Sequence, residues 1–383
     1  MTEDKGTLVP QIRFRGFTDA WVQRKLGEIL KVNSGKDYKH LNSGNIPVYG
    51  TGGYMLSVDE SLSEVDAIGI GRKGTIDKPQ FLTAPFWTVD TLFFMTPLQD
   101  NTLSFLYSLS QNIKWVMMDE STGVPSLSKV NIENVDTHVP KTTEQTAIGN
   151  FFRTLDDTIT LYKRKLDGLK ALKRGYLQQM FPQMGENAPR IRFAGFSEDW
   201  QEHHLKDLIT SVVREVPKPE KAYTRLSIRS HAKGTFHQMV DNPDTVAMDK
   251  LYVVKANDLV VNITFAWEHA IAVANIEDDG LLVSHRFPTF LIDKSDVNFI
   301  KYSVSTEKFR YKMDLISPGG AGRNRVLNKS DFILLKLKTP KTIEEQKLIG
   351  NFFCNLDEQI ITHQSKLDKL KKLKTAHLQK MFI

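Results

Sequence analysis

The sequence predicts an α+β protein in which two globular domains are joined by two long antiparallel coiled-coil helices, in a pseudo-twofold and nearly circular arrangement. Three observations support this class. A short motif occurs twice, a long helical segment occurs twice, and two unlike stretches rich in short strands lie between them. Internal repetition indicates duplicated structural units. At 383 residues the chain is long enough for two or three domains.

The short motif Pro-x-Ile-Arg-Phe-x-Gly-Phe occupies residues 10–17 and returns at residues 189–196, and each copy is followed by a tryptophan, Trp21 or Trp200. The long segment 145–181 matches 346–382 with 20 identities in 37 positions. Both long copies read Ile-Gly-Asn-Phe-Phe, then Leu-Asp, Lys-Leu-Asp and Leu-Gln-x-Met-Phe. The order of short motif, variable region and long repeat therefore occurs twice.

The long repeats have the apolar spacing of a coiled coil, with steps that alternate between four and three residues. The predicted seam consists of Ile148, Phe152, Leu155, Ile159, Leu166 and Leu169 in the first copy and of Ile349, Phe353, Leu356, Ile360, Leu367 and Leu370 in the second. Each segment predicts a helix of about 40 residues, roughly 60 Å long. A helix interior disfavours Gly by about 1 kcal/mol, so Gly168 and Gly175, present in the first copy alone, predict bending or fraying there.

The charges of the two helices favour antiparallel pairing. Acidic residues lie in the first half of each helix and basic residues in the second half. Parallel helices would bring like charges together, whereas antiparallel helices bring acids against bases. The alternative is that this polarity only complements the helix dipole. Antiparallel pairing predicts two separated heads on a rod, and it predicts that Phe382 lies near Pro10 as Phe181 lies near Pro189.

The two variable regions are expected to be α+β domains with mixed or antiparallel sheets. Strand-like runs include Ala67–Ile70, Thr88–Phe94 and Leu259–Phe265, separated by Gly and Pro. The predicted boundaries are 1–141 for the first domain with its short motif, 142–181 for the first helix, 182–341 for the second domain and 342–383 for the second helix.

Composition excludes several classes of protein. The single Cys354 excludes an internal disulfide framework and a cysteine-based zinc site. No apolar run approaches the roughly 20 residues of a membrane span, and no signal peptide begins the chain. A cytoplasmic protein without membrane contact is expected. The formal net charge of +6 is compatible with nucleic acid as a partner.

Two segments are similar to motifs of enzymes, but the residues in or around each segment argue against an enzymatic site. Residues 69–74 match Gly-x-Gly-x-x-Gly, but the prolines at 79 and 85 oppose the helix that a dinucleotide site needs. This segment is either a loop that meets phosphate or a base edge, or a plain β-turn. Residues 262–265 are similar to the Asn-Pro-Pro-Tyr/Phe motif of amino-methyltransferases but lack both prolines, and a strand is expected. We predict no catalytic residue, no metal site and no cofactor on this chain.

Two separated, unlike heads suit a split DNA site, because half-sites are set by a fixed spacing. Exposed cations beside aromatic residues are the candidates for contact, since Arg binds guanine bidentately and Lys anchors phosphate. The predicted DNA-binding residues are Lys36, Tyr54, Arg72 and Lys73 in the first domain and Arg225, Arg229, Lys233, Arg286, Arg323 and Arg325 in the second.

The doubled order of motifs resembles the specificity subunit of type I restriction-modification systems. The match rests on the twin Pro-x-Ile-Arg-Phe-x-Gly-Phe…Trp and Ile-Gly-Asn-Phe-Phe…Leu-Gln-x-Met-Phe segments and covers nearly the whole chain. Residues 67–75 and 86–90 also resemble a target recognition domain. The resemblance implies that each variable region reads half of a bipartite, asymmetric site on double-stranded DNA, and that the helices set the gap between the halves.

The resemblance also implies partner proteins. The repeated segments would dock two methyltransferase subunits, and two restriction subunits with motor and nuclease activity would complete the complex. S-adenosylmethionine, ATP and Mg²⁺ would belong to those partners, which would methylate adenine at N6 and cut DNA. Two alternatives make different predictions. A stand-alone methyltransferase or nuclease would bind its own cofactor, and a non-catalytic two-headed scaffold for protein or RNA would show no sequence-selective duplex binding.

Overall fold

The computed structural model describes residues 9–317 and 326–383. The chain divides into two compact units, residues 1–164 with 364–383 and residues 165–363. Each unit holds one variable region, part of helix α4 (Thr142–Gln179) and part of helix α8 (Ile343–Met381). Within the described residues, no helix is both long enough and apolar enough to cross a membrane.

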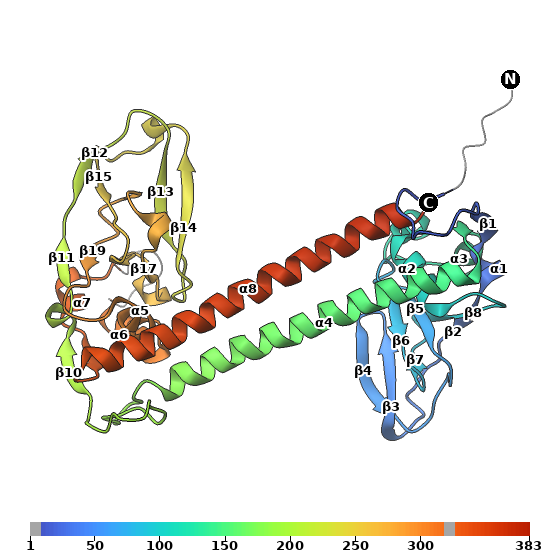
Figure 1. Cartoon of the computed structure of the whole chain (residues 1–383), viewed down its shortest axis with the longest axis horizontal. Coiled ribbons are helices and arrows are strands. Elements are labelled where there is room, and N and C mark those ends of the chain that lie inside the picture. Colours follow the sequence, from blue (N-terminus) through green and yellow to red (C-terminus); the bar gives the residue numbers. More distant parts are fainter. Residues whose placement is uncertain (1–8, 318–325) are drawn as a thin grey trace. The chain divides into compact units, whose positions relative to one another are not determined.

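The first unit contains a four-stranded antiparallel sheet in the order β2-β8-β5-β6, a three-stranded sheet in the order β4-β3-β7, and the antiparallel pair β1-β9 (Figure 1). Its elements are β1 (Val22–Lys25), α1 (Leu26–Ile29), β2 (Leu30–Ser34), β3 (Ser43–Gly50), β4 (Gly53–Val58), β5 (Ala67–Gly71), β6 (Gln80–Leu82), β7 (Trp87–Thr88), β8 (Leu92–Pro97), α2 (Leu103–Asn112), the 3₁₀ helix η1 (Trp115–Met118), α3 (Lys129–Glu133) and β9 (Asp136–Val139). Strand β3 pairs with β7 in parallel, so the three-stranded sheet is mixed while the four-stranded sheet is antiparallel, within the prediction of mixed or antiparallel sheets.

The central strand β5 is buried at every position because both of its faces are covered. Ile68 and Ile70 pack in one core cluster with Phe105 of α2, while Ala67 packs in a second cluster with Val48 of the three-stranded sheet. Alternate side chains of a strand point to opposite faces. A continuous apolar run is therefore what this strand requires.

The second unit contains a four-stranded antiparallel sheet in the order β11-β19-β16-β17, a five-stranded sheet in the order β12-β15-β18-β13-β14, and the antiparallel pair β10-β20. Its elements are β10 (Gln201–His204), η2 (Leu205–Asp207), β11 (Thr210–Val212), β12 (Glu215–Pro217), β13 (Tyr223–Ile228), β14 (Thr235–Val240), η3 (Pro243–Thr245), β15 (Lys250–Val253), β16 (Leu259–Val261), η4 (Ala266–Glu268), β17 (Ile271–Val273), η5 (Ile276–Asp278), β18 (Leu282–Val283), β19 (Thr289–Leu291), α5 (Val297–Val304), α6 (Glu307–Ile316), α7 (Lys329–Ile333) and β20 (Lys336–Thr339). The parallel pairing of β13 with β18 makes the larger sheet mixed.

Two predicted strands are wrong in extent. The run Thr88–Phe94 divides into β7 and β8, because Leu92 donates its backbone N–H to the carbonyl of Val89 in a turn. The run Leu259–Phe265 is a strand only as far as Val261. Polar residues interrupt both runs, Asp90 and Thr91 in the first and Asn262 and Thr264 in the second, and the chain leaves the strand at these positions.

The long helices pair antiparallel inside each unit, as predicted. In the first unit, Lys374 in the second half of α8 forms an ion pair with Asp156 in the first half of α4, at 2.5 Å. In the second unit, Lys173 of α4 pairs with Asp357 of α8, also at 2.5 Å. The two ion pairs occupy equivalent positions of the repeat. The charge pattern therefore reports helix orientation and not only dipole compensation.

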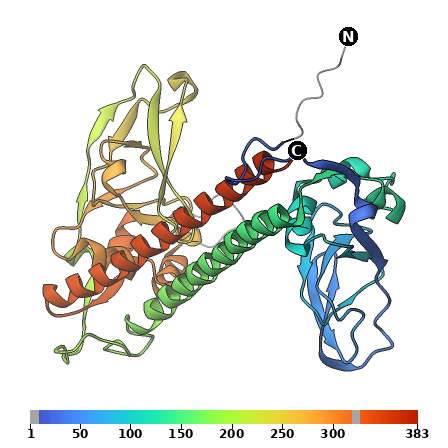
Figure 2. The ribbon, with the colours of Figure 1, turned by 45° about the vertical axis from the view of Figure 1, so that its right-hand side comes forward.

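The short motif is tied to the end of a long helix in both units. In the first, Ile12 donates its N–H to the carbonyl of Lys380 at 3.0 Å, and Figure 2 shows the C-terminus beside this N-terminal segment. In the second, Ile191 makes the same bond to Gln179, at 3.0 Å. The predicted neighbourhood of Phe382 and Pro10 is confirmed by this pairing, which lies within the first unit.

Each short motif also carries an arginine that pairs with a buried glutamate. Arg13 forms two hydrogen bonds with Glu144 (2.6 and 2.7 Å), and Arg192 forms two with Glu345 (2.6 and 2.8 Å). The bidentate contact raises the pKa of each arginine above its ordinary value. In both units, the arginine of the short motif thus connects this motif to the glutamate in the first turn of a long helix. We call this connection the joint of each unit.

A matching aromatic cluster lies at each joint. Its members are Trp21, Phe105, Phe152 and Phe382 in the first unit and Trp200, Phe299, Phe353 and Phe181 in the second. All eight side chains are buried. The Phe-Phe and Met-Phe positions shared by the two repeats therefore contribute to the core where helix, short motif and globular domain meet.

Gln145 and Gln346, at equivalent positions of the repeat, connect the long helices to the starts of α2 and α5. Gln145 accepts the N–H of Thr102 at 3.0 Å, where α2 begins, and Gln346 accepts that of Asp296 at 2.9 Å, where α5 begins. A Cβ on Gly149 would lie 2.2 Å from Ser104 Oγ. The Ile-Gly-Asn sequence is thus a contact surface in which glycine permits the approach.

The predicted seam residues lie on one buried face of each helix. Most are buried: Ile148, Phe152, Leu155, Leu166, Ile349, Phe353, Leu356 and Leu367. The half-buried ones are Ile159, Leu169, Ile360 and Leu370. The first residues of each seam pack against the globular core, since Ile148 shares a cluster with Phe105. Helix α4 runs without interruption through Gly168 and Gly175.

Candidate nucleic-acid interface

The described cations predicted for DNA binding in the second unit line one cavity. Arg225, Arg229, Lys233 and Arg286 surround a volume of about 730 Å³. They come from β13, from the β13–β14 turn and from the loop between β18 and β19. The remaining two candidates, Arg323 and Arg325, lie outside the described residues.

Side-chain contacts hold two of these arginines in place. Arg225 donates its Nε–H to Gln238 Oε1 across the β13–β14 pair, at 2.9 Å. The Arg229 guanidinium lies 4.9 Å from the ring centre of Phe236 and donates to the carbonyl of Thr235. A guanidinium that is already fixed loses less conformational freedom when it binds a planar ligand.

The turn that presents Lys233 is anchored on the core. His231 and Ala232 both have left-handed backbones, with φ of 61° and 49°. Their N–H groups donate to the carbonyls of Glu268 and His269, each at 2.8 Å. His269 is buried and its Nε2 donates to the carbonyl of Val304 at 2.6 Å, and burial lowers its pKa. These hydrogen bonds hold the backbone of the turn in its left-handed conformation and offset its strain.

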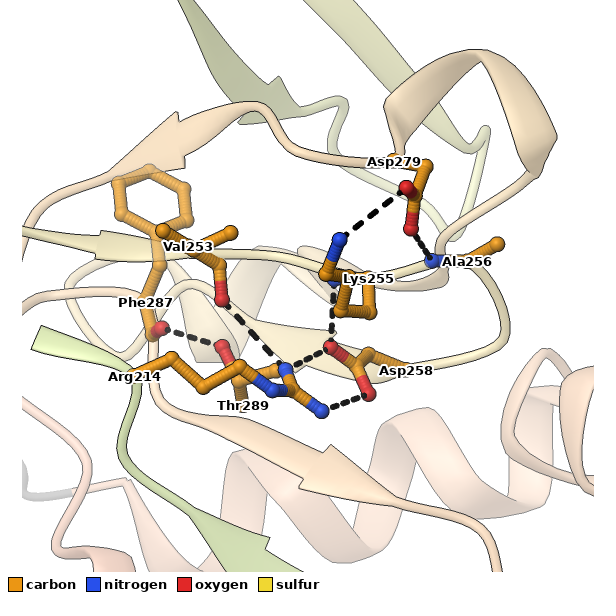
Figure 3. Close-up of polar contacts among 8 residues, drawn as sticks. All are labelled: Arg214, Val253, Lys255, Ala256, Asp258, Asp279, Phe287 and Thr289. Atoms are coloured by element: carbon orange, nitrogen blue, oxygen red, sulfur yellow. Dashed lines mark hydrogen bonds and ion pairs between the residues drawn. The ribbon is translucent and has the colours of Figure 1, made fainter.

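A buried ion pair links the two sheets of the second unit. Arg214 donates to both carboxylate oxygens of Asp258, at 2.5 and 3.1 Å, and to the carbonyl of Val253 at 3.4 Å (Figure 3). Asp258 is fully buried and also accepts the N–H of Lys255 at 2.8 Å. Arg214 follows β11, Val253 ends β15 and Asp258 precedes β16. The pair therefore joins the four-stranded sheet to the five-stranded sheet.

In the first unit, the segment Trp87–Thr91 joins the loops that carry the candidates. Arg72 and Lys73 donate their N–H groups to the carbonyl of Thr91, at 2.8 and 3.3 Å, and Lys36 donates its N–H to the carbonyl of Thr88 at 2.9 Å. Arg72, Lys73 and Lys36 are exposed. Lys36 and the pair Arg72 and Lys73, which are far apart in the sequence, are thus held beside the segment 87–91.

Tyr54 belongs to the same region through the β3–β4 hairpin. It is 63% exposed and its ring contacts Tyr49 at 6.5 Å between centroids. Val89 donates its N–H to the carbonyl of Tyr49 at 3.0 Å. The hairpin turn is also tied to β6, because Gln80 Nε2 donates to the carbonyl of Gly50 at 3.0 Å. All the candidates of the first unit therefore surround one set of connected loops.

The Gly-x-Gly-x-x-Gly segment begins inside β5 and continues into the connection to β6, and no helix lies between these two strands. A Cβ on Gly71 would lie 2.0 Å from the carbonyl oxygen of Thr75, and Gly74 has φ of 91°. The glycines thus serve a tight turn. This geometry agrees with the rejection of a dinucleotide site. Arg72 and Lys73 are exposed, while their backbone is held between Thr91 and residues 125–127.

The family of the chain follows from its duplicated organisation. A family model described as the type I restriction modification DNA specificity domain matches twice, at residues 18–171 and 197–372. The chain belongs to this family. It is a type I specificity subunit, with two recognition domains that supply DNA sequence specificity.

One known specificity subunit is similar to the chain in sequence, and one solved S subunit is similar to it in fold. The chain is 21% identical over 329 residues to the specificity subunit of the type I restriction enzyme MjaVIII from Methanocaldococcus jannaschii, over 82% of this chain and 74% of that protein. The crystal structure of the S subunit of a type I restriction-modification system from M. genitalium matches with a TM-score of 0.70 at 12% identity, over 98% of this chain and 99% of that one. The second comparison shows a shared fold.

Some residues of the cavity in this specificity subunit were not among the sequence candidates. Phe236, Phe265 and Phe287 line it, as do Asn262 and Glu268. Asn262 lies beyond β16, in a turn where its Oδ1 accepts the N–H of Thr264 at 3.1 Å, so the predicted strand is wrong at this position. Aromatic residues in strand-like runs are ordinary core residues, and only their half-exposed tertiary position distinguishes these.

Proposed function

We propose that the recognition domain of each unit reads one half of a bipartite, asymmetric DNA site. In the second domain the reading surface is the cavity with Arg225, Arg229, Lys233 and Arg286, and this convergence of four cations with aromatic rings is the observation that carries the proposal. In the first domain it is the loop region around Arg72. The two surfaces use different residues on different loops, which is why the two half-sites are expected to differ.

The chemistry of these side chains suits base recognition. A fixed guanidinium such as Arg225 matches the two acceptors of guanine in the major groove. Lys233 suits phosphate, which positions the duplex without reading its sequence. Glu268, whose carboxylate accepts the hydroxyl of Ser230, suits the amino group of cytosine.

The repeated surfaces are the proposed docking sites for two methyltransferase subunits. Each unit exposes an isoleucine of the short motif, Ile12 at 39% or Ile191 at 38%, and a leucine of a long helix, Leu373 at 44% or Leu172 at 46%. Equal apolar side chains at equivalent exposed positions favour one partner bound twice.

The remaining parts of the proposal concern the complex. The helices act as the spacer between half-sites, and two restriction subunits complete the assembly. S-adenosylmethionine, ATP and Mg²⁺ bind to those partners, and this chain is the non-catalytic subunit. A cytoplasmic location follows from its DNA partner and its single cysteine.

The first test is a map of methylated adenines in the host genome, with and without the gene. A split motif should vanish when the gene is deleted. In the double variant Arg225→Ala/Arg286→Ala, one half of the motif should become degenerate and the other half should stay unchanged. In the variant Arg72→Ala, the opposite half should become degenerate. A loss of about 1–3 kcal/mol is expected for each base contact. Uniform weakening on all DNA would identify phosphate contacts and contradict the assigned base reading.

The spacer role has a separate test. Inserting four residues at equivalent places in both helices adds one turn, about 6 Å. The methylated motif should then keep both half-sequences and gain about one to two base pairs in its gap. Altered half-sequences with an unchanged gap would contradict the spacer role.

A further inference from the structure

A short loop of the first unit, residues 119–126, is closed by one carboxylate. Asp119 Oδ1 accepts the N–H of Ser126 at 2.9 Å, together with the N–H and the hydroxyl of Ser121 at 2.9 and 2.8 Å. The bonds from Ser126 and Ser121 hold the pKa of Asp119 below its ordinary value, so the carboxylate stays ionised at neutral pH. Glu120 also donates its N–H to the carbonyl of Ser126 at 3.3 Å. The two ends of the loop are therefore fixed against each other.

Backbone hydrogen bonds tie this loop to the 71–74 turn. Gly74 donates its N–H to the carbonyl of Pro125 at 2.8 Å, and Leu127 donates its N–H to the carbonyl of Arg72 at 2.9 Å. The loop thus lies beside the exposed side chain of Arg72, which belongs to the surface proposed to read the first half-site.

The second unit has the same connection at its proposed reading surface. Strands β5 and β16 hold the same place in their four-stranded sheets, β2-β8-β5-β6 and β11-β19-β16-β17. In the turn after β16, the carbonyl of Ile263 accepts the N–H of Leu327 at 2.8 Å, as Arg72 accepts that of Leu127 in the first unit. Both sequence neighbours of Ile263 line the cavity of about 730 Å³. This turn therefore borders a reading surface in the second unit, and the equivalent position favours the same role in the first.

The tip of the 119–126 loop, residues 122–125, presents an exposed valine. Val124 is 66% exposed, and it lies between Gly123 and Pro125 on a backbone that is anchored at both ends. One exposed valine is ordinary in itself. A β-branched side chain on a fixed backbone, however, has few rotamers to lose on contact with an apolar group. In the major groove of DNA that apolar group is the 5-methyl of thymine.

We propose that Val124 contacts the 5-methyl group of a thymine in the first half-site, and that Asp119 is the positioning residue that holds the loop for this contact. The inference rests on the proposed function, because a duplex must first lie over Arg72 and Lys73. The methyl group is what distinguishes thymine from uracil, and it is absent from cytosine. Val124 thus adds a preference for an A·T pair at one position of this half-site.

The experiment replaces thymine by uracil at each thymine of the first half-site in turn, in a duplex with the split motif. The wild type, Val124→Ala and Val130→Ala are compared as full chains purified with their methyltransferase subunits. Val130 of α3 is 62% exposed, so Val130→Ala makes the same change on a different exposed element. The measured quantity is the ratio of affinities for the thymine and uracil duplexes.

Loss of one buried methyl group should weaken binding of the wild type about fourfold at one thymine position. Val124→Ala should bind the thymine duplex more weakly than the wild type does and should lose most of this discrimination. Val130→Ala should discriminate as the wild type does. Uracil in the second half-site should affect the three proteins equally.

The positioning role has its own pair of variants. Asp119→Ala removes the acceptor that closes the loop, so its discrimination against uracil should fall as it does in Val124→Ala. Asp119→Asn keeps an oxygen acceptor for the N–H groups of Ser121 and Ser126 and should retain most of the discrimination. Equal discrimination by Asp119→Ala and the wild type would contradict this role.

The contact with thymine is overturned if the first half-site has no A·T pair, or if the wild type binds thymine and uracil duplexes equally at every position. Discrimination that survives in Val124→Ala, or that is lost equally in Val130→Ala, would also overturn it. Equal binding of both duplexes together with weaker retention of methyltransferase subunits by Val124→Ala would assign the tip to a protein partner instead. Failure of the proposed function looks different, because the wild type itself would then show no preference for the split motif.

Discussion

Two buried ion pairs, one in each unit, join the short motif to a long helix. Glu345 is 1% exposed and Arg192 13%, so neither charge is well hydrated. Arg192→Ala should destabilise the second unit by about 3–5 kcal/mol, because an uncompensated carboxylate stays buried. Urea unfolding followed by tryptophan fluorescence measures this loss. Lys341→Ala, which removes an exposed pair with Glu198, should cost about 1 kcal/mol or less.

A buried imidazole predicts a pH dependence of stability. Burial lowers the pKa of His269 below its unfolded value of about 6.5. Above that pH both states are neutral and the residue contributes no slope. As pH falls below about 6.5 the unfolded chain takes up a proton that the folded chain resists, so stability decreases by at most about 1.4 kcal/mol per pH unit.

His269→Gln separates this residue from the other titrating groups. Glutamine can still donate to the carbonyl of Val304 but does not titrate. The loss of melting temperature between pH 7.5 and pH 5.5 should therefore be smaller in the variant than in the wild type. Identical losses in the two proteins would show that protonation of His269 does not contribute to the pH dependence of stability.

Glycines of the long helices fall into two kinds at the scale of elements. A Cβ on Gly350 would lie 2.7 Å from Asn298 Cβ and 2.9 Å from the Phe299 nitrogen, whereas a Cβ on Gly168 meets nothing within 4 Å. Gly350→Ala should cost about 1–3 kcal/mol through overpacking against α5. Gly168→Ala should stabilise by up to about 1 kcal/mol.

Both substitutions lie in the second unit, so thermal unfolding of the two variants compares like with like. Destabilisation by both would indicate that Gly168 has a packing partner. Stabilisation by both would show that α5 can move away from α8 without loss.

At the scale of the whole molecule, the first and last parts of the chain are joined by a hydrogen bond between Ile12 and Lys380. The joint made by Ile191 and Gln179 occurs within a continuous chain, whereas the equivalent joint of Ile12 and Lys380 connects the two ends. A circular permutant that joins Ile383 to Met1 and opens between Met184 and Gly185 should fold. The new connection, residue 383 followed by residues 1–9, is longer than the natural one, residues 182–188.

Circular dichroism and a methylation map check the permutant. The helix content and the methylated motif should match those of the parent. A soluble permutant with a changed half-site, or one that fails to fold while its parent folds, would contradict the equivalence of the two joints.

The recognition domains were less predictable than the helices. Arg225, Arg229, Lys233 and Arg286 were chosen as exposed cations, yet nothing in their spacing shows that they share a cavity. Phe265 and Phe287 were not predicted as site residues, because an aromatic residue is more often part of the core. The turn at Val89 is followed by the polar residues Asp90 and Thr91, which are typical of a turn and which the predicted strand Thr88–Phe94 wrongly included.

The sequence by itself determined the doubled order of motifs, the two long helices and their antiparallel pairing. These depend on local periodicity and on charge along one helix, which a linear pattern contains. Only the tertiary structure decided which loops meet around a reading surface and which side of α4 faces the recognition domain. Such contacts join residues far apart in the chain, through hydrogen bonds and packing that no local pattern specifies.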